Sequence, residues 1–283
     1  MRDHASESLL MRRLNCFIAA MLIAAPGAIL ASPQQILSLD DFTSEIGENT
    51  VTFIATDLET DATCQLEGSD PQSRHAPWST FKIPNFLIAL ETGVVAGPDI
   101  MTAWDANQRP AAHFWPNAWR QGQTLRTAFQ ASAVWYFQDI ALDVGTARYR
   151  TILQDWQYGN VNIPDGSDDF WLNNDLQISA QEQVDFLAML LTDQLSVNDT
   201  SLAHLSEASR AWTGGTTTLH GKTGSGPTPS GFEGWYVGWI IRPGSPPTIF
   251  ALYTTAPRYR DLRDFRQSFA MTLLRRCGFL PNA

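Results

Sequence analysis

Lysine is almost absent from this sequence of 283 residues. It occurs only at Lys82 and Lys222, and arginine supplies the rest of the basic charge. Acidic residues outnumber basic ones, so the formal net charge is −10 at pH 7. Proteins that bind nucleic acids or anionic membranes need a basic surface, and we therefore expect neither kind of partner.

Cysteine is scarce as well, with three residues at Cys16, Cys64 and Cys277. The last two could form a disulfide in an oxidising compartment, and the sequence leaves open whether they pair. Their spacing matches no metal-binding motif, and the five histidines show no metal-ligand spacing either. We expect no metal ion.

Long apolar runs are missing except near the N-terminus. Residues 11–32 contain two arginines, an apolar run and then small residues, which is typical of a secretory signal peptide. We predict a signal peptide over residues 1–31, in which a start at Met11 would make residues 1–10 an upstream extension. No later segment reaches the roughly 18 apolar residues of a membrane-spanning helix. Residues 32–283 are therefore expected to form one exported, periplasmic catalytic domain without a membrane anchor.

The order of the predicted elements indicates an α+β fold. Residues 50–56 are β-branched and aromatic and predict a strand, whereas residues 86–95 are apolar on nearly every face, as in a buried helix. The other predicted helices cover 124–141, 145–156, 179–195 and 263–277, and the other strands cover 215–224, 234–242 and 248–256. We expect an antiparallel sheet flanked by N- and C-terminal helices, with an all-helical lobe inserted between its two halves.

Both lysines lie in short motifs with chemical meaning. Ser79 and Lys82 form S-x-x-K, and helical spacing places the two side chains on one face. Serine needs a base to become a nucleophile, and a desolvated lysine can lose its proton whereas an arginine cannot. Lys222 opens K-T-G at the end of a predicted strand. S-x-x-K followed later by K-T-G is the paired signature of penicillin-recognising serine enzymes.

Three further motifs lie between these two. In chain order the five are STFK (79–82), SAV (132–134), YGN (158–160), FWL (170–172) and KTG (222–224). Together they resemble the class D, oxacillinase-type serine β-lactamases, and the resemblance extends over about residues 50–280. It implies a hydrolase that opens the β-lactam ring of penicillin-type antibiotics through an acyl-serine intermediate and so confers antibiotic resistance.

The resemblance also implies roles for individual residues. Ser79 would be the nucleophile, and Lys82 would carry a CO₂-derived carbamate that serves as general base, held by Trp171. Val134 stands where an asparagine is usual in related enzymes, and with Trp171 it would keep Lys82 dry. Ser132 would relay a proton to the β-lactam nitrogen, with Lys222 supplying positive charge nearby.

Substrate binding would involve the strand that carries K-T-G and the terminal helix. Thr223, Gly224 and Ser225 would line the site, and the backbone N–H groups of Ser79 and Ser225 would form the oxyanion hole. Arg263 and Arg266 both lie where the family places a cation for the substrate carboxylate, and the spacing to the C-terminus favours Arg266.

Two other functions remain open at this stage. A β-lactam sensor domain would acylate once and signal, and a penicillin-binding peptidase would release its product slowly. The first is expected to be attached to a transmembrane helix, and the second to carry an anchor or a further domain. The substrate spectrum and the choice between monomer and homodimer are not predicted by these motifs.

Overall fold

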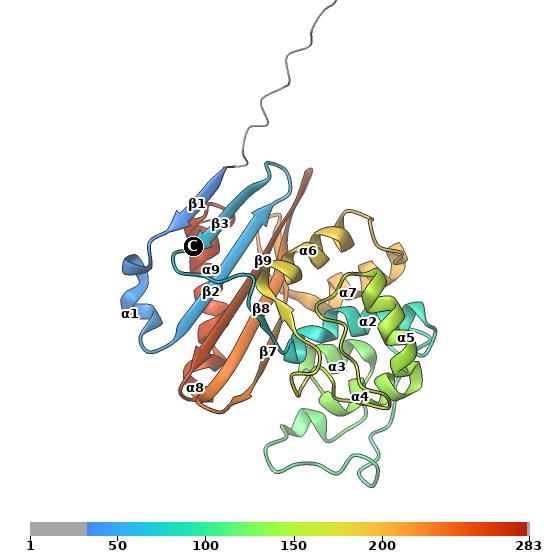
Figure 1. The fold of residues 1–283 in the computed structure, drawn as a ribbon. Helices are drawn as coiled ribbons and strands as arrows, with labels where there is room; N and C mark the ends of the chain where they lie inside the picture. The colour runs from blue at the N-terminus through green and yellow to red at the C-terminus, as the bar shows by residue number, and fades with distance from the viewer. Residues whose placement is uncertain (1–32, 282–283) are drawn as a thin grey trace, which may run out of the picture. The chain divides into compact units, whose positions relative to one another are not determined.

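A computed structural model describes residues 33–281, so the predicted signal peptide lies outside the described residues. Seven strands form one sheet in the order β1-β3-β2-β9-β8-β7-β6 (Figure 1). Only β1 and β3 run parallel, and every other neighbouring pair is antiparallel. The strands are β1 (Gln34–Leu37), β2 (Thr50–Asp57), β3 (Ala62–Leu66), β6 (Arg210–Gly214), β7 (Thr217–Thr228), β8 (Gly231–Arg242) and β9 (Ser245–Ala256). The predicted α+β class is confirmed.

Helices α2 to α7 gather on one side of the sheet, whereas α8 and α9 lie along the opposite face (Figure 1). The first group is α2 (Lys82–Glu91), α3 (Leu125–Ala131), α4 (Val134–Val144), α5 (Thr146–Asp155), α6 (Ala180–Leu191) and α7 (Asp199–Ser209). The second is α8 (Tyr259–Arg263) and α9 (Phe265–Arg276). The helical lobe is therefore inserted between the N-terminal and C-terminal strands, as the sequence predicts.

Smaller elements connect these parts. Strands β4 (Arg74–His75) and β5 (Ile178–Ser179) form a separate two-stranded ladder, and η1 (Leu39–Phe42), α1 (Thr43–Ile46), η2 (Trp78–Phe81) and η3 (Asn117–Trp119) are short helical turns. Ser179 and Glu182 form the capping box that begins α6. No helix within residues 33–281 is both long enough and apolar enough to cross a membrane.

The alternation of side chains along β8 produces two cores. Trp235, Val237 and Trp239 point toward the helical lobe, whereas Tyr236 and Ile240 pack with α9 on the other face. All five are buried. A central strand that is covered on both faces has no polar face, which is why this segment of the sequence is almost uniformly apolar. Trp235 and Trp239 thus pack the sheet against the helical lobe.

Cys64 and Cys277 form a disulfide between β3 and the end of α9, with their Cα atoms 6.0 Å apart. The pairing that the sequence leaves open is therefore made in the structure. It joins residues 213 positions apart and ties the terminal helix to the N-terminal part of the sheet.

Two predicted helices are interrupted in the structure. The helix predicted over 263–277 is divided, because α8 ends at Arg263 and α9 begins at Phe265. The helix predicted over 124–141 is interrupted at Ser132, whose φ of +60° is left-handed. Short strands β1, β3 and β6 were not predicted, since strands of four or five residues carry little periodic signal.

Candidate active site

Ser79 and Lys82 lie where the 3-10 turn η2 leads into α2. Lys82 begins α2, and Pro84 occupies the first turn, where the missing N–H costs the helix no hydrogen bond. One helical turn brings the two side chains together, so that Lys82 Nζ lies 2.9 Å from Ser79 Oγ. Ser79 is half-buried, and the base and nucleophile expected from the sequence are in hydrogen-bond contact.

The environment of Lys82 disfavours its charged form. The side chain has no solvent-exposed surface, and the ring of Phe137 is centred 5.2 Å from its Nζ atom. The pKa of Lys82 lies well below its usual value. Burial is the larger cause, and the neighbouring charge of Lys222 is the smaller one. The lowered pKa of Lys82 favours the neutral amine, which is the form that can accept a proton.

Ser132 and Lys222 form the second pair. Ser132 caps the C-terminal end of α3 in a left-handed conformation, and Lys222 Nζ donates to its Oγ at 3.1 Å. Lys222 also donates to the carbonyl oxygen of Thr223 at 3.0 Å. Burial and the charge of Arg266 lower the pKa of Lys222 to about 7.

Strand β7 lies directly against the turn that carries Ser79. A Cβ atom placed on Gly224 would lie 3.1 Å from the backbone nitrogen of Ser79 and 2.8 Å from the carbonyl oxygen of Pro77. Glycine is therefore required at this point of the K-T-G motif, because any side chain would push the strand away. The contact brings Ser225, the next residue of β7, near the nucleophile.

Arg266 reaches the same strand from α9. Its Nη1 donates to the carbonyl oxygen of Gly224 at 2.8 Å, and the side chain is only 6% exposed. Arg263 instead pairs with Asp264, with a distance of 3.1 Å between Nε and Oδ1. Of the two arginines considered from the sequence, Arg266 is the one that contacts the K-T-G strand.

Trp171 and Val134 lie on different segments of the helical lobe. Trp171 is fully buried and stacks on Phe81, with ring centroids 5.3 Å apart. Its indole Nε1 atom is buried without a hydrogen-bond partner. Val134 is the first residue of α4 and is half-buried. An unpartnered buried donor is costly, which suggests that this indole has a partner in the working protein.

Two carboxylates of the loop between the YGN and FWL motifs form ion pairs with arginines. Asp165 pairs with Arg150, and Asp168 pairs with Arg109. Tyr158 is fully buried. Within residues 33–281, no three His, Cys, Asp or Glu side chains are grouped as a metal site would require.

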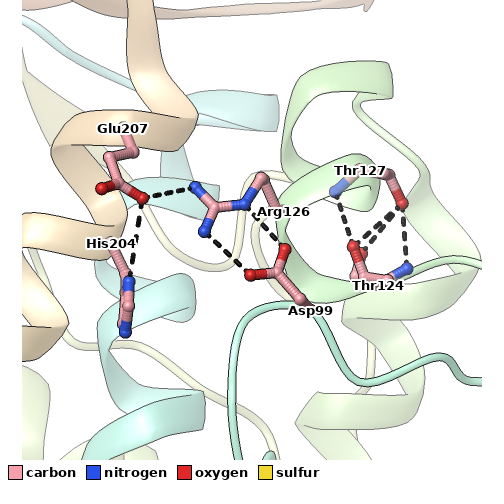
Figure 2. Close-up of polar contacts among 6 residues, drawn as sticks. All are labelled: Asp99, Thr124, Arg126, Thr127, His204 and Glu207. Carbon is pink, nitrogen blue, oxygen red and sulfur yellow. Dashed lines mark hydrogen bonds and ion pairs between the residues drawn. The ribbon is translucent and has the colours of Figure 1, made fainter.

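An arginine that the motifs do not include holds the helix ending at Ser132. Figure 2 shows Arg126 of α3 between Asp99 and Glu207. Its guanidinium makes two bonds to the Asp99 carboxylate, at 2.8 and 3.0 Å, and one to Glu207 at 2.9 Å. These contacts join the loop before α3, α3 itself and α7, so they restrain the segment that presents Ser132.

Sequence reasoning also missed a buried carboxylate that contacts Trp78, the residue directly before Ser79. Glu233 of β8 is 5% exposed and accepts a hydrogen bond from the indole Nε1 of Trp78 at 2.6 Å. The signal was present, since Glu233 directly precedes the apolar run 234–241 of a central strand, where a charged residue is unusual.

Comparisons with known proteins agree with this geometry. The family model described as the penicillin binding protein transpeptidase domain matches residues 34–270. Beta-lactamase OXA-20 of Pseudomonas aeruginosa is 30% identical over 283 residues, covering 96% of this chain and 99% of that protein. The class D beta-lactamase of Sebaldella termitidis superposes with a TM-score of 0.79 at 26% identity, covering 88% of this chain and 100% of that structure.

A second solved structure has the same fold. The C-terminal domain of the Bacillus licheniformis BlaR penicillin-receptor also gives a TM-score of 0.79, covering 91% of this chain and all of that domain. Its sequence is only 24% identical, so this likeness concerns the fold alone.

Proposed function

The chain belongs to the class D serine β-lactamases of the penicillin-recognising superfamily, and we propose that it hydrolyses β-lactams through an acyl-Ser79 intermediate with Lys82 as the general base. One observation carries this proposal. Lys82 Nζ lies 2.9 Å from Ser79 Oγ, and the Lys82 side chain has no solvent-exposed surface. A base within hydrogen-bond reach and with a lowered pKa is what nucleophilic serine requires.

We propose that Lys82 is carboxylated by CO₂ in the working enzyme. The neutral amine forms an N–C bond with CO₂ and releases one proton, so the reaction needs the lowered pKa of this lysine. The unpartnered Nε1–H of Trp171 fits as a donor to the resulting carbamate, and Val134 helps to exclude water. When present, the carbamate supplies an anionic base next to Ser79.

Ring opening would use the residues around β7. As Ser79 Oγ attacks the β-lactam carbonyl, the backbone N–H groups of Ser79 and Ser225 would donate to the developing oxyanion. The close approach of Gly224 to the Ser79 nitrogen supports this placement of the two donors. Removal of one such donor typically costs about 3 kcal/mol of transition-state stabilisation.

Ser132 would deliver the proton that the β-lactam nitrogen needs as the C–N bond breaks. The contact of 3.1 Å from Lys222 Nζ to Ser132 Oγ supports a relay in which Ser132 donates its proton and takes one from Lys222. With a pKa of about 7, Lys222 can both give and recover a proton near neutral pH.

Arg266 and Lys222 would bind the carboxylate that β-lactam antibiotics carry. Thr223 and Gly224 would line the part of the site that holds this carboxylate. Arg266 contacts Gly224, and its Nε atom is buried without a partner. Water would then attack the acyl-Ser79 ester and release the product. We propose that this happens in the periplasm and makes the host resistant to penicillin-type antibiotics.

A penicillin receptor with the same fold makes single acylation the main alternative function. The test mixes the purified protein with excess chromogenic cephalosporin and counts turnovers. A hydrolase converts many molecules per protein, whereas a receptor or slow peptidase stops near one. Ser79→Ala should abolish both turnover and the acyl adduct seen by mass spectrometry. Resistance is tested by expressing the wild-type and Ser79→Ala proteins in a susceptible bacterium.

A further inference from the structure

Trp78, the residue directly before the proposed nucleophile, has an unusual backbone. Its φ is +50°, in the left-handed region that bulky residues rarely adopt. Such conformations persist only where the surrounding contacts impose them, and they are common at functional sites. The contacts of Trp78 therefore indicate what shapes the turn that presents Ser79.

Three contacts fix Trp78. Its backbone N–H donates to the carbonyl oxygen of Trp171 at 3.1 Å. Its indole Nε1 donates to Glu233 Oε1 at 2.6 Å. Its ring covers Gly226 so closely that a Cβ atom there would overlap it. Gly226 pairs with Glu233 across β7 and β8, so the indole lies over this pair of residues.

Glu233 is held by neutral donors. Its Oε2 accepts a hydrogen bond from the hydroxyl of Tyr253 at 2.7 Å, and His75 Nδ1 lies 3.9 Å from the same oxygen. His75 stacks on Tyr253, with ring centroids 3.8 Å apart. Among the ion pairs of residues 33–281, none joins Glu233 to a lysine or arginine. A buried carboxylate without a cationic partner is expensive, so its retention calls for a purpose.

The position of the indole suggests that purpose. Trp78 precedes Ser79 in the chain, and the Gly226 that it covers follows Ser225. Ser79 and Ser225 are the two residues whose backbone N–H groups would form the oxyanion hole. We propose that Glu233 is a positioning residue that acts through Trp78 to fix the spacing and direction of the Ser79 and Ser225 N–H groups. This inference rests on the proposed acyl-Ser79 mechanism.

Variants of the contact separate positioning from simple stability. Glu233→Leu removes both acceptors, whereas Glu233→Gln keeps an oxygen for Trp78 and an NH₂ group that can donate to the Tyr253 hydroxyl. Trp78→Phe keeps a ring over Gly226 but removes the indole donor. Tyr253→Phe is the matched control, because it removes one donor to Glu233 and leaves the Trp78 bond in place.

Two readouts report on the oxyanion hole. One is the acylation rate constant with a chromogenic cephalosporin, and the other is the affinity for phenylboronic acid, which forms a tetrahedral adduct with an active serine. We expect Glu233→Leu and Trp78→Phe to lower both by about tenfold to hundredfold, as small misplacements of catalytic groups do. Glu233→Gln and Tyr253→Phe should stay close to the wild type.

The inference is overturned if Trp78→Phe keeps wild-type acylation and boronate affinity, or if Tyr253→Phe lowers both as much. Trp78→Phe decides the matter even if Glu233→Leu fails to fold. Wild-type protein is analysed by mass spectrometry in the same experiment. Absence of both its acyl-Ser79 adduct and its turnover of the cephalosporin contradicts the proposed function itself, whereas normal wild-type turnover with unaffected variants contradicts only the role of Glu233.

Discussion

Lys82 Nζ and Ser79 Oγ are 2.9 Å apart, and the lysine side chain is completely enclosed by protein. Proximity provides the path for proton transfer, and enclosure favours the neutral amine that can accept a proton because it lowers the pKa of Lys82. Arginine, which supplies almost all other basic charge in this chain, stays protonated in such a site. Because lysine is so scarce elsewhere, its presence at position 82 indicates that this site requires a basic side chain that can lose its proton.

The first prediction concerns the charge state at this position. Lys82→Arg keeps a cation but cannot release its proton, so kcat/KM should fall by at least about a hundredfold, the usual contribution of a general base. Lys82→Ala should fall as far, with at most slow acylation of Ser79. Steady-state hydrolysis of a penicillin measures both. Near-normal hydrolysis by either variant would contradict the role of Lys82.

Burial of Lys82 should also cost stability. Because the folded pKa lies below the unfolded one, the unfolded chain binds more protons between those two values, and folding stability rises with pH there. Lys82→Met removes the buried amine and should therefore raise the free energy of unfolding at pH 7. The gain should be largest at acidic pH and vanish toward about pH 10.5, the ordinary lysine value. Urea unfolding in CO₂-free buffer tests this; a gain that grows with pH would contradict it.

Substrate affinity should depend on the protonation of Lys222. Its pKa is lowered to about 7, so the side chain is charged below that pH and neutral above it. We expect KM for a penicillin to rise by about tenfold between pH 6 and pH 8.5, because a charge-assisted hydrogen bond to the substrate carboxylate is lost. Lys222→Arg, which stays charged, should show a flat KM over this range. An equally steep rise in that variant would assign the effect to another group.

The disulfide should stabilise the fold without affecting the chemistry. Cys64 belongs to the core on the α9 face of the sheet, and Cys277 packs against the same core. The double variant Cys64→Ser, Cys277→Ser should lose about 2–4 kcal/mol of unfolding free energy. Its kcat at 25 °C should match the wild type. Dithiothreitol should lower wild-type stability but leave the double variant unchanged, and equal stability of the two proteins would be the contrary result.

Motif spacing predicted one side-chain contact that the structure shows, whereas periodicity predicted the fold class but missed three short strands. The S-x-x-K contact follows from helical geometry alone, so Ser79 and Lys82 could be paired in advance. The contact between Lys222 and Ser132 could be expected only from the family resemblance and not from local geometry, because it depends on the left-handed turn at Ser132 and on how β7 approaches α3. Long-range packing of this kind leaves no local pattern.

The same limit explains what was missed. Glu233 and Trp78 are 155 positions apart, and only the pairing of β7 with β8 brings them together. Arg126 likewise meets Asp99 and Glu207 through the packing of α3 against α7 and the preceding loop (Figure 2). Composition alone allowed Cys64 and Cys277 to be considered as partners. Only the three-dimensional structure shows that they are close enough to form a disulfide.

Carboxylation of Lys82 is the central claim, and bicarbonate dependence tests it most directly. The protein is brought to pH 6 in CO₂-stripped buffer, and hydrolysis of a penicillin is followed as bicarbonate is added at constant pH and ionic strength, with sodium chloride as the matched control. We predict low initial activity that bicarbonate restores and chloride does not. Activity that is independent of bicarbonate would contradict the claim and leave Lys82 acting as a free amine.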